Sequence, residues 1–259
     1  MSVRVGVQIQ PQHADFDGMR RAWREAEELG VDSIFNWDHF YPLYGEPDGE
    51  HFESLTSMAS LAEVTERAQI GSLVICNSYR NPDLLADAHR TIDHISGGRV
   101  VLGIGAGWFE RDYDEYGYEF GTAGDRLRAL GAALPRIKAR LAKLNPPPVG
   151  PMPFLIGGGG EKVTLRLVAE HADLWHSFGD VATYLHKAEV LAAHCAKLGR
   201  DPSEIEHTWG IQAGLLESAD DLHAAGISQL TIGIGGGGRG YDLAPLRELI
   251  EWRDGVNRV

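Results

Sequence analysis

The sequence predicts a single (β/α)8 barrel, the TIM-barrel fold, and three observations lead to this fold class. Strand-like and helix-like patterns alternate along the whole chain, and eight such pairs can be counted. The length of 259 residues matches the roughly 250 residues of one such barrel. Alternating strands and helices indicate parallel strands joined by right-handed crossovers. We therefore expect one domain over residues 1–259, although the proline-rich stretch 145–153 could also be read as a linker between two domains.

The first four strand and helix pairs follow directly from the spacing of apolar residues. Alternating valines and an isoleucine predict a strand at 3–10, and apolar residues at helical spacing predict a helix at 16–29. Further strands are expected at 32–37, 68–76 and 99–104, and further helices at 55–64, 84–95 and 127–144. The segment 105–124 is expected to be a long loop.

The second half of the chain continues the alternation with shorter elements. Strands are expected at 154–156, 173–178, 205–213 and 229–234. The helices that follow them are expected at 162–171, 181–198, 219–225 and 243–253. The loops after the second and fourth strands are long, whereas the turns that lead into strands are short. In a barrel the loops after the strands form the face that carries the active site.

Composition and charge limit the partners of the chain. The formal net charge of −13 repels phosphate backbones and anionic lipid surfaces, so we expect neither nucleic acid nor a membrane as a partner. Cys76 and Cys195 fit no metal-ligand spacing, so we predict no metal site and no disulfide framework. No segment has the pattern of a signal peptide or a membrane span, and a reducing cytoplasm is the expected location.

Titratable side chains follow two of the predicted strands. Asp38 and His39 come directly after the second strand, at the expected mouth of the barrel. A carboxylate and an imidazole there could make polar contacts to a cofactor or move a proton, or they could form a capped turn. Arg80 follows the third strand and could face an anion or hold loops together.

Two glycine runs follow strands and are candidate phosphate sites. Residues 157–160 lie between a strand and a helix, where backbone N–H groups and the helix dipole favour an anion, although a flexible loop would look the same. Residues 235–238, followed by Arg239, come after the eighth strand and could bind phosphate or form a mobile loop.

The loop after the fourth strand combines glycines with aromatic residues. Gly103, Gly105 and Gly107 resemble half of a dinucleotide fingerprint, but the third glycine of that motif is missing and no helix follows at once. They are better suited to letting a flat ligand lie against the backbone. The aromatic residues could form an apolar wall or a small core of their own, and they are Trp108, Phe109, Tyr113, Tyr116, Tyr118 and Phe120. No nucleophile elbow, P-loop or zinc-hydrolase motif is present, which leaves redox chemistry with a bound cofactor.

The chain resembles the luciferase-like monooxygenase superfamily, and within it the oxidoreductases that use the deazaflavin coenzyme F420. Three stretches carry the resemblance and together cover most of residues 1–210: NWDHF, ERAQIGSLVICNSYRNPDLLADAHRTIDHISGGRVVLGIGAGWFERDYDEYGYEF and FLIGGGGEKVTLRLVAEHADLWH. The resemblance implies a barrel with the cofactor at its C-terminal mouth, and frequently a homodimer. The DHF string favours F420 over FMN, which remains the alternative cofactor.

The resemblance also implies roles for individual residues. His39 is expected to handle a proton or to stabilise charge on the reduced ring, and Asp38 to orient polar groups of the ring. A non-prolyl cis peptide is expected at Leu73-Val74, where it would form a bulge behind the ring. Further cofactor contacts are implied at Asn77, Gly107, Gly157, Gly158, Gly159 and Gly160.

One position departs from the family pattern. In the sugar-phosphate dehydrogenases of this family a glutamate that acts as an acid follows the GxGxG string, but here that place is Trp108, and Glu110 lies two residues further along. The sequence therefore places that reaction in doubt. The function we expect is hydride transfer between F420 and a small organic substrate. The rival interpretations are an FMN-dependent monooxygenase using reduced flavin and oxygen, and a non-catalytic flavin or deazaflavin carrier.

Overall fold

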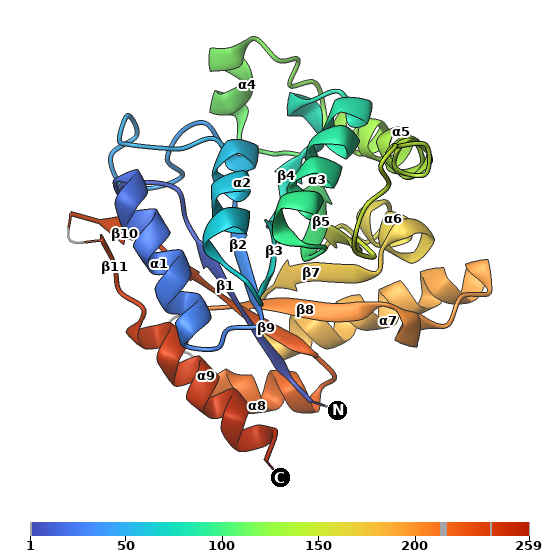
Figure 1. Ribbon diagram of the computed structural model, residues 1–259. Helices are drawn as coiled ribbons and strands as arrows, with labels where there is room; N and C mark the ends of the chain where they lie inside the picture. The colour runs from blue at the N-terminus through green and yellow to red at the C-terminus, as the bar shows by residue number, and fades with distance from the viewer. Residues whose placement is uncertain (1, 213–216, 239, 259) are drawn as a thin grey trace.

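The fold is a closed barrel of parallel strands surrounded by helices (Figure 1). The structure is a computed structural model, and it describes residues 2–212, 217–238 and 240–258. Neighbouring strands follow the order β3-β2-β1-β9-β8-β7-β6-β5-β4, and the pairing of β3 with β5 closes the ring. The barrel strands are β1 (Arg4–Ile9), β2 (Ser33–Asn36), β3 (Gln69–Ser72), β4 (Ile75–Cys76), β5 (Val100–Gly105), β6 (Phe154–Gly157), β7 (Leu174–Phe178), β8 (Glu206–Ile211) and β9 (Gln229–Ile234).

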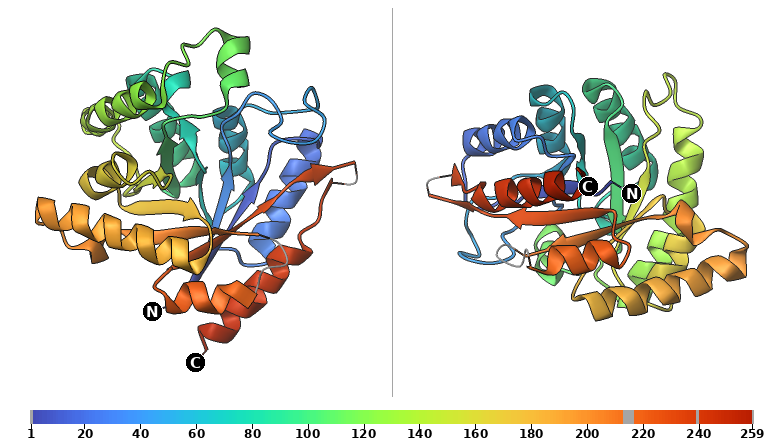
Figure 2. Two further views of the ribbon diagram at one scale, coloured as in Figure 1. Left: turned by 180° about the vertical axis from the view of Figure 1, so that it is seen from behind. Right: turned by 90° about the horizontal axis from the view of Figure 1, so that it is seen from below.

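The helices cover the outside of the barrel, and α4 stands apart at one end of it (Figures 1 and 2). The α-helices are α1 (Phe16–Glu28), α2 (Ser54–Val64), α3 (Pro82–Ser96), α4 (Glu110–Tyr116), α5 (Ala123–Leu141), α6 (Thr164–His171), α7 (Val181–Leu198), α8 (Glu217–Ala224) and α9 (Ala244–Val256). Short 3-10 turns, η1 (Asn77–Tyr79) and η2 (Pro202–Glu204), complete the described chain. No described helix is long and apolar enough to cross a membrane.

Local sequence signals explain where several helices begin and end. The Asn81 side chain accepts from the amides of Asp83 and Leu84 and caps α3, whose first residue is Pro82. Such a cap contributes about 1 kcal/mol to helix stability. The same helix ends at Gly97, which has a φ of 70° that an L residue adopts only at a cost. Helix α3 is therefore fixed at both ends, and with it the segment between β4 and β5.

The core lies mainly between the barrel wall and the helices. Alternating residues of β1 such as Val5, Val7 and Ile9 have no exposed surface, as the strand pattern predicts. Trp23 of α1 and Trp209 of β8 are also fully buried in the same cluster. Burial of this apolar surface is the dominant favourable term for the fold. The prediction of a single (β/α)8 barrel is confirmed.

The structure differs from the sequence prediction in three places. The predicted third strand consists of two strands, β3 and β4. The residues between them are joined by a cis peptide bond at Leu73-Val74, and the position predicted for this bond is confirmed. Part of the predicted loop 105–124 forms helix α4. The second glycine run forms a small antiparallel hairpin of β10 (Gly236–Gly237) and β11 (Gly240–Tyr241), while Arg239 and Ala213 lie outside the described residues.

Candidate active site

A large cavity opens at the carboxyl ends of the barrel strands. Its volume is about 1030 Å³, at the upper end of the range for small-molecule and cofactor sites. Among the residues predicted to bind a cofactor, those that line the cavity are Asp38, His39, Leu73, Val74, Gly107, Gly157, Gly158, Gly159 and Gly160. Asn77 is buried at the start of η1 and does not line the cavity. The second glycine run, which could have been a phosphate site, does not line it either.

Asp38 is buried and paired with Arg80. The Arg80 Nη1 and Nη2 atoms lie 2.5 and 2.9 Å from the two Asp38 carboxylate oxygens, and the Cys76 amide donates to the same carboxylate at 2.9 Å. Arg80 also donates to Glu53 at 2.5 Å. Burial opposes the charge on Arg80, but the two carboxylates outweigh it and raise the pKa of the guanidinium above its usual value. Arg80 therefore holds together the loops after β2 and β4, one of the two roles open to it from the sequence.

His39 is a titratable group in the cavity wall with one ring nitrogen unbonded. Its Nδ1 atom lies 2.7 Å from Oδ2 of Asp112, and its side chain is 12% exposed. The Nε2 atom has no hydrogen-bond partner among the described residues. Because His39 lines the cavity, Nε2 is the atom available to a bound ligand. This arrangement can accept or donate one proton at the cavity wall.

Asp112 reaches His39 from helix α4 and is fully buried. Besides His39, it accepts from the Phe40 amide at 3.1 Å and from the Tyr79 hydroxyl at 3.0 Å. Burial, together with the neighbouring Cys76 and Asp112 groups, raises the pKa of Tyr79. The hydroxyl therefore stays protonated and donates a hydrogen bond to the Asp112 carboxylate. The sequence pattern points to no role for Asp112, because it predicts a loop over residues 105–124, where the structure has α4.

The aromatic residues of this segment serve both of the roles considered for them. Tyr113, Tyr118 and Phe120 pack with Phe40 and Tyr79 in a small separate core. Trp108 instead is 63% exposed and lines the cavity, and its ring lies 5.8 Å from the ring of His39. Glu110 is exposed at the start of α4 and does not line the cavity, so it does not stand in for the glutamate that Trp108 replaces.

The glycines of β5 make room for neighbouring parts of the protein. A Cβ atom on Gly103 would lie 2.1 Å from the Ser72 carbonyl oxygen, and one on Gly105 would lie 2.8 Å from a Val74 methyl group. A Cβ on Gly157 would lie 2.9 Å from the other Val74 methyl. These glycines thus accommodate the bulge at Leu73-Val74, which places Val74 in the cavity wall. Gly105 and Gly107 also line the cavity, so the expectation that this segment lets a flat ligand lie against the backbone stays a prediction.

The first glycine run forms another part of the cavity wall, between β6 and α6. The Gly158 amide donates to the carbonyl oxygen of His176 at 2.9 Å, so it is not free for a phosphate. The amides of Gly159 and Gly160 have no hydrogen-bond acceptor among the described residues. Helix α6 begins only at Thr164, so the run precedes the helix by one turn. The Gly158 amide is therefore occupied, whereas the amides of Gly159 and Gly160 can donate to an anion.

A half-buried histidine lies beside this run. His176 of β7 lines the cavity, and its Nδ1 atom lies 2.9 Å from the hydroxyl of Thr208. Burial lowers the pKa of His176 to about 4, so its ring is neutral near pH 7. His176 can offer a neutral hydrogen-bonding group to a ligand. It was not singled out from the sequence, because one histidine in a strand gives no signal of its own.

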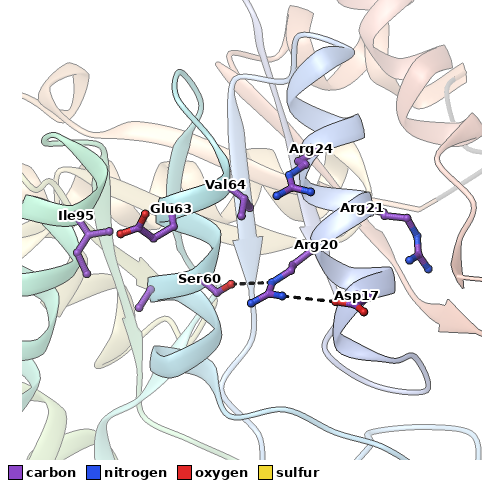
Figure 3. A pocket seen from close by; sticks show the side chains of 9 residues that line it. Asp17, Arg20, Arg21, Arg24, Ser60, Glu63, Val64 and Ile95 are labelled. Atoms are coloured by element: carbon purple, nitrogen blue, oxygen red, sulfur yellow. Dashed lines mark hydrogen bonds and ion pairs between the residues drawn. The ribbon is translucent and has the colours of Figure 1, made fainter.

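A second hollow of about 770 Å³ lies on the outer surface between α1, α2 and α3 (Figure 3). In Figure 3 the Arg20 side chain reaches from α1 to Ser60 on α2 and to Asp17 on its own helix, at 3.4 and 3.5 Å. The hollow is lined largely by exposed charged groups of both signs and lies away from the strand ends. It therefore does not compete with the barrel mouth as a candidate active site.

Comparison with known proteins identifies the family. Residues 1–232 match the family model described as luciferase-like monooxygenase. The chain belongs to this family, and the resemblance drawn from the sequence is confirmed at that level.

Named relatives lie among enzymes that use F420. The F420-dependent glucose-6-phosphate dehydrogenase of Amycolatopsis mediterranei is 33% identical over 156 residues, which cover 53% of this chain and 46% of that protein. The corresponding enzyme of Rhodococcus erythropolis is 29% identical over 206 residues, which cover 70% of this chain and 59% of that protein. The chain thus spans about half the length of these curated relatives.

Solved structures share the fold at low sequence identity. An F420-dependent secondary alcohol dehydrogenase, solved with an F420-acetone adduct, has a TM-score of 0.80 at 17% identity, with 90% of this chain and 93% of that chain covered. The F420-dependent tetrahydromethanopterin reductase of Methanopyrus kandleri has a TM-score of 0.74 at 14% identity, with the same coverage. At such identities these structures establish the fold alone.

Proposed function

We propose that the protein is an F420-dependent oxidoreductase that transfers a hydride between the deazaflavin and a small organic substrate at the barrel mouth. The observation that carries the proposal is the cavity of about 1030 Å³ with the His39 ring in its wall. Membership of the luciferase-like family and the names of the relatives support F420 as the cofactor. The proposal extends to this chain what those names say of other proteins.

The residues of the cavity fit such a cofactor. Val74 and the backbone of Gly107 would face the ring system from one side of the cavity. The unbonded amides of Gly159 and Gly160 would hold an anionic phosphate. His176, neutral near pH 7, would supply a polar contact without adding charge. When bound, the deazaflavin would supply two-electron hydride chemistry, and its ring carbon does not activate oxygen as a flavin nitrogen does.

The chain itself supplies proton handling, orientation and shielding from water. His39 Nε2 would take the proton of a substrate hydroxyl during oxidation and return it during reduction. Trp108 and Trp37 would cover the reacting atoms and exclude water. Asp38 is already bound to Arg80, so we propose that it holds the loop that carries His39, and orients ring polar groups only through its remaining lone pairs.

Glucose 6-phosphate is not the substrate that we propose. The position of the family acid is occupied by Trp108, and Glu110 does not line the cavity. The substrate class that the site supports is a small molecule whose oxidation releases one proton to His39. A homodimer remains a prediction from the resemblance, and a cytoplasmic location remains a prediction from the cysteine content and the sequence pattern. Sedimentation of the purified protein would test the first.

A fluorescence titration with F420 and with FMN tests the proposed function. Wild type and His39→Ala should both bind F420 with micromolar affinity, while His39→Ala loses turnover on a panel of alcohols and carbonyl compounds. His186→Ala, on the outer surface of α7, is the matched control and should behave like wild type. Binding of FMN in preference to F420, with oxygen consumption, would instead establish the monooxygenase. Tight F420 binding without turnover on any substrate would establish a carrier.

A further inference from the structure

We propose that Asp112 is a positioning residue that keeps the proton of the His39 ring on Nδ1 and so leaves the Nε2 lone pair facing the cavity. The inference rests on the proposed function, because it assumes that His39 handles a proton there. It adds a residue to the site that neither the sequence motifs nor the names of the relatives indicate.

The contacts of Asp112 determine which way its hydrogen bonds run. The Phe40 amide can only donate, and the Tyr79 hydroxyl keeps its proton because burial and neighbouring groups raise its pKa. An ionised carboxylate only accepts, so Nδ1 of His39, 2.7 Å from Oδ2, must be the donor. A neutral imidazole protonated at Nδ1 is unprotonated at Nε2. The Nε2 atom of His39, which is open to the cavity, is thus a proton acceptor.

Helix α4 is held firmly enough to fix this geometry. The ring of Tyr116 stacks on Phe40 with centroids 4.0 Å apart, which ties α4 to the residue next to His39. The Tyr113 hydroxyl lies 3.2 Å from the Cys76 sulfur and fixes α4 to the end of β4. Asp112 has no exposed surface, so water does not compete for its oxygens.

The consequence for the reaction is a directed proton transfer. When bound, F420 would supply the acceptor for the hydride that leaves the C–H bond of the substrate. His39 Nε2 would take the proton of the substrate O–H bond. The electron pair of that O–H bond forms the carbonyl C=O bond. The imidazolium that results is then stabilised by the Asp112 carboxylate behind it. The reverse reaction returns the same proton to the carbonyl oxygen.

The test compares Asp112→Asn with Tyr79→Phe, using His39→Ala to assign the His39 signals. In protein labelled with ¹⁵N-histidine, long-range ¹H–¹⁵N spectra report which ring nitrogen carries the proton, without turnover. Wild type should show the Nδ1-H form of His39. Asp112→Asn should shift it to the Nε2-H form, because the asparagine amide can donate to Nδ1.

The kinetic expectation separates positioning from simple structural support. Asp112→Asn should lower kcat by about 100-fold or more, the range in which one proton-transfer group contributes. Its KM and its F420 affinity should change by less than about threefold, and Asp112→Glu should recover part of kcat. Tyr79→Phe removes one donor but leaves the carboxylate, so it should keep the wild-type tautomer.

Two results would overturn the inference, and each is distinct from a failure of the proposed function. Wild-type His39 could be protonated at Nε2, or Asp112→Asn could leave the tautomer unchanged; either result removes the positioning role, and both are read without turnover. Full turnover by His39→Ala with F420 bound would instead refute the role proposed for His39 itself. If Asp112→Asn does not fold, the wild-type spectrum alone still decides between the two tautomers.

Discussion

Replacing Arg80 with methionine should destabilise the fold strongly, because it leaves a buried carboxylate unpaired. The Asp38 side chain has no exposed surface and Arg80 is 12% exposed, so loss of this pair belongs to the range of about 3–5 kcal/mol for breaking a buried ion pair. The Glu53 carboxylate is 38% exposed, so its bond to Arg80 adds about 1 kcal/mol or less. We expect the free energy of unfolding to fall by about 4 kcal/mol.

The pH dependence of this loss gives the reasoning a second test. Burial raises the pKa of Asp38, and Arg80 is the main group that opposes this effect. In Arg80→Met the pKa of Asp38 therefore rises further. A carboxyl with a raised pKa in the folded state contributes stability at low pH that is lost as the pH rises. The deficit of the variant should therefore be larger at pH 8 than at pH 5.

The assay is urea unfolding followed by circular dichroism at both pH values. The matched control is Arg136→Met, which removes an exposed and solvent-screened pair with Asp83 and should leave the urea midpoint nearly unchanged. Adding Asp38→Asn to Arg80→Met should restore part of the stability, because no buried charge then remains. The reasoning is wrong if Arg80→Met costs no more than the control, or if its deficit does not depend on pH.

Two further predictions concern a glycine and a histidine. Gly107→Ala would place a Cβ atom 2.1 Å from the Tyr113 hydroxyl, so it should cost about 2–4 kcal/mol by thermal unfolding and weaken F420 binding at least tenfold. Gly117→Ala, also at positive φ but with open space, should cost about 1 kcal/mol and spare binding. Burial lowers the pKa of His89 to about 4, so the unfolded chain takes up its proton first and stability should fall as the pH drops from about 6.5 to 4. His89→Gln should flatten this dependence in urea midpoints, and an unchanged slope would contradict it.

The barrel itself could be predicted from the sequence because its signals are local and repeated. Apolar alternation in strands such as β1 and helical spacing in helices such as α1 recur through the whole chain. The position of Asp38 and His39 at the mouth then follows from the rule that loops after strands carry the site. The cis peptide at Leu73-Val74 came only from the resemblance to a family, since nothing in the residues themselves signals it.

The partners of the site residues could not be predicted, because they come from segments distant in sequence. Asp112 meets His39 across 73 positions, and its helix carries charged and aromatic residues without an apolar period. Thr208 meets His176 in the same way, through the pairing of β7 with β8. A one-dimensional pattern shows which residues reach the barrel mouth, but the fold decides which of them touch. An acidic residue that follows a GxGxG string by a few positions is the one signal that could have pointed to Asp112.

The most direct test of the proposed function is a crystal structure of the protein with F420. We predict that the deazaflavin ring occupies the cavity that His39, Val74 and Gly107 line, with its phosphate at the amides of Gly159 and Gly160. The Nε2 atom of His39 should face the reacting side of the ring. Density for F420 elsewhere on the molecule, or a cavity that admits FMN but not F420, would contradict the account.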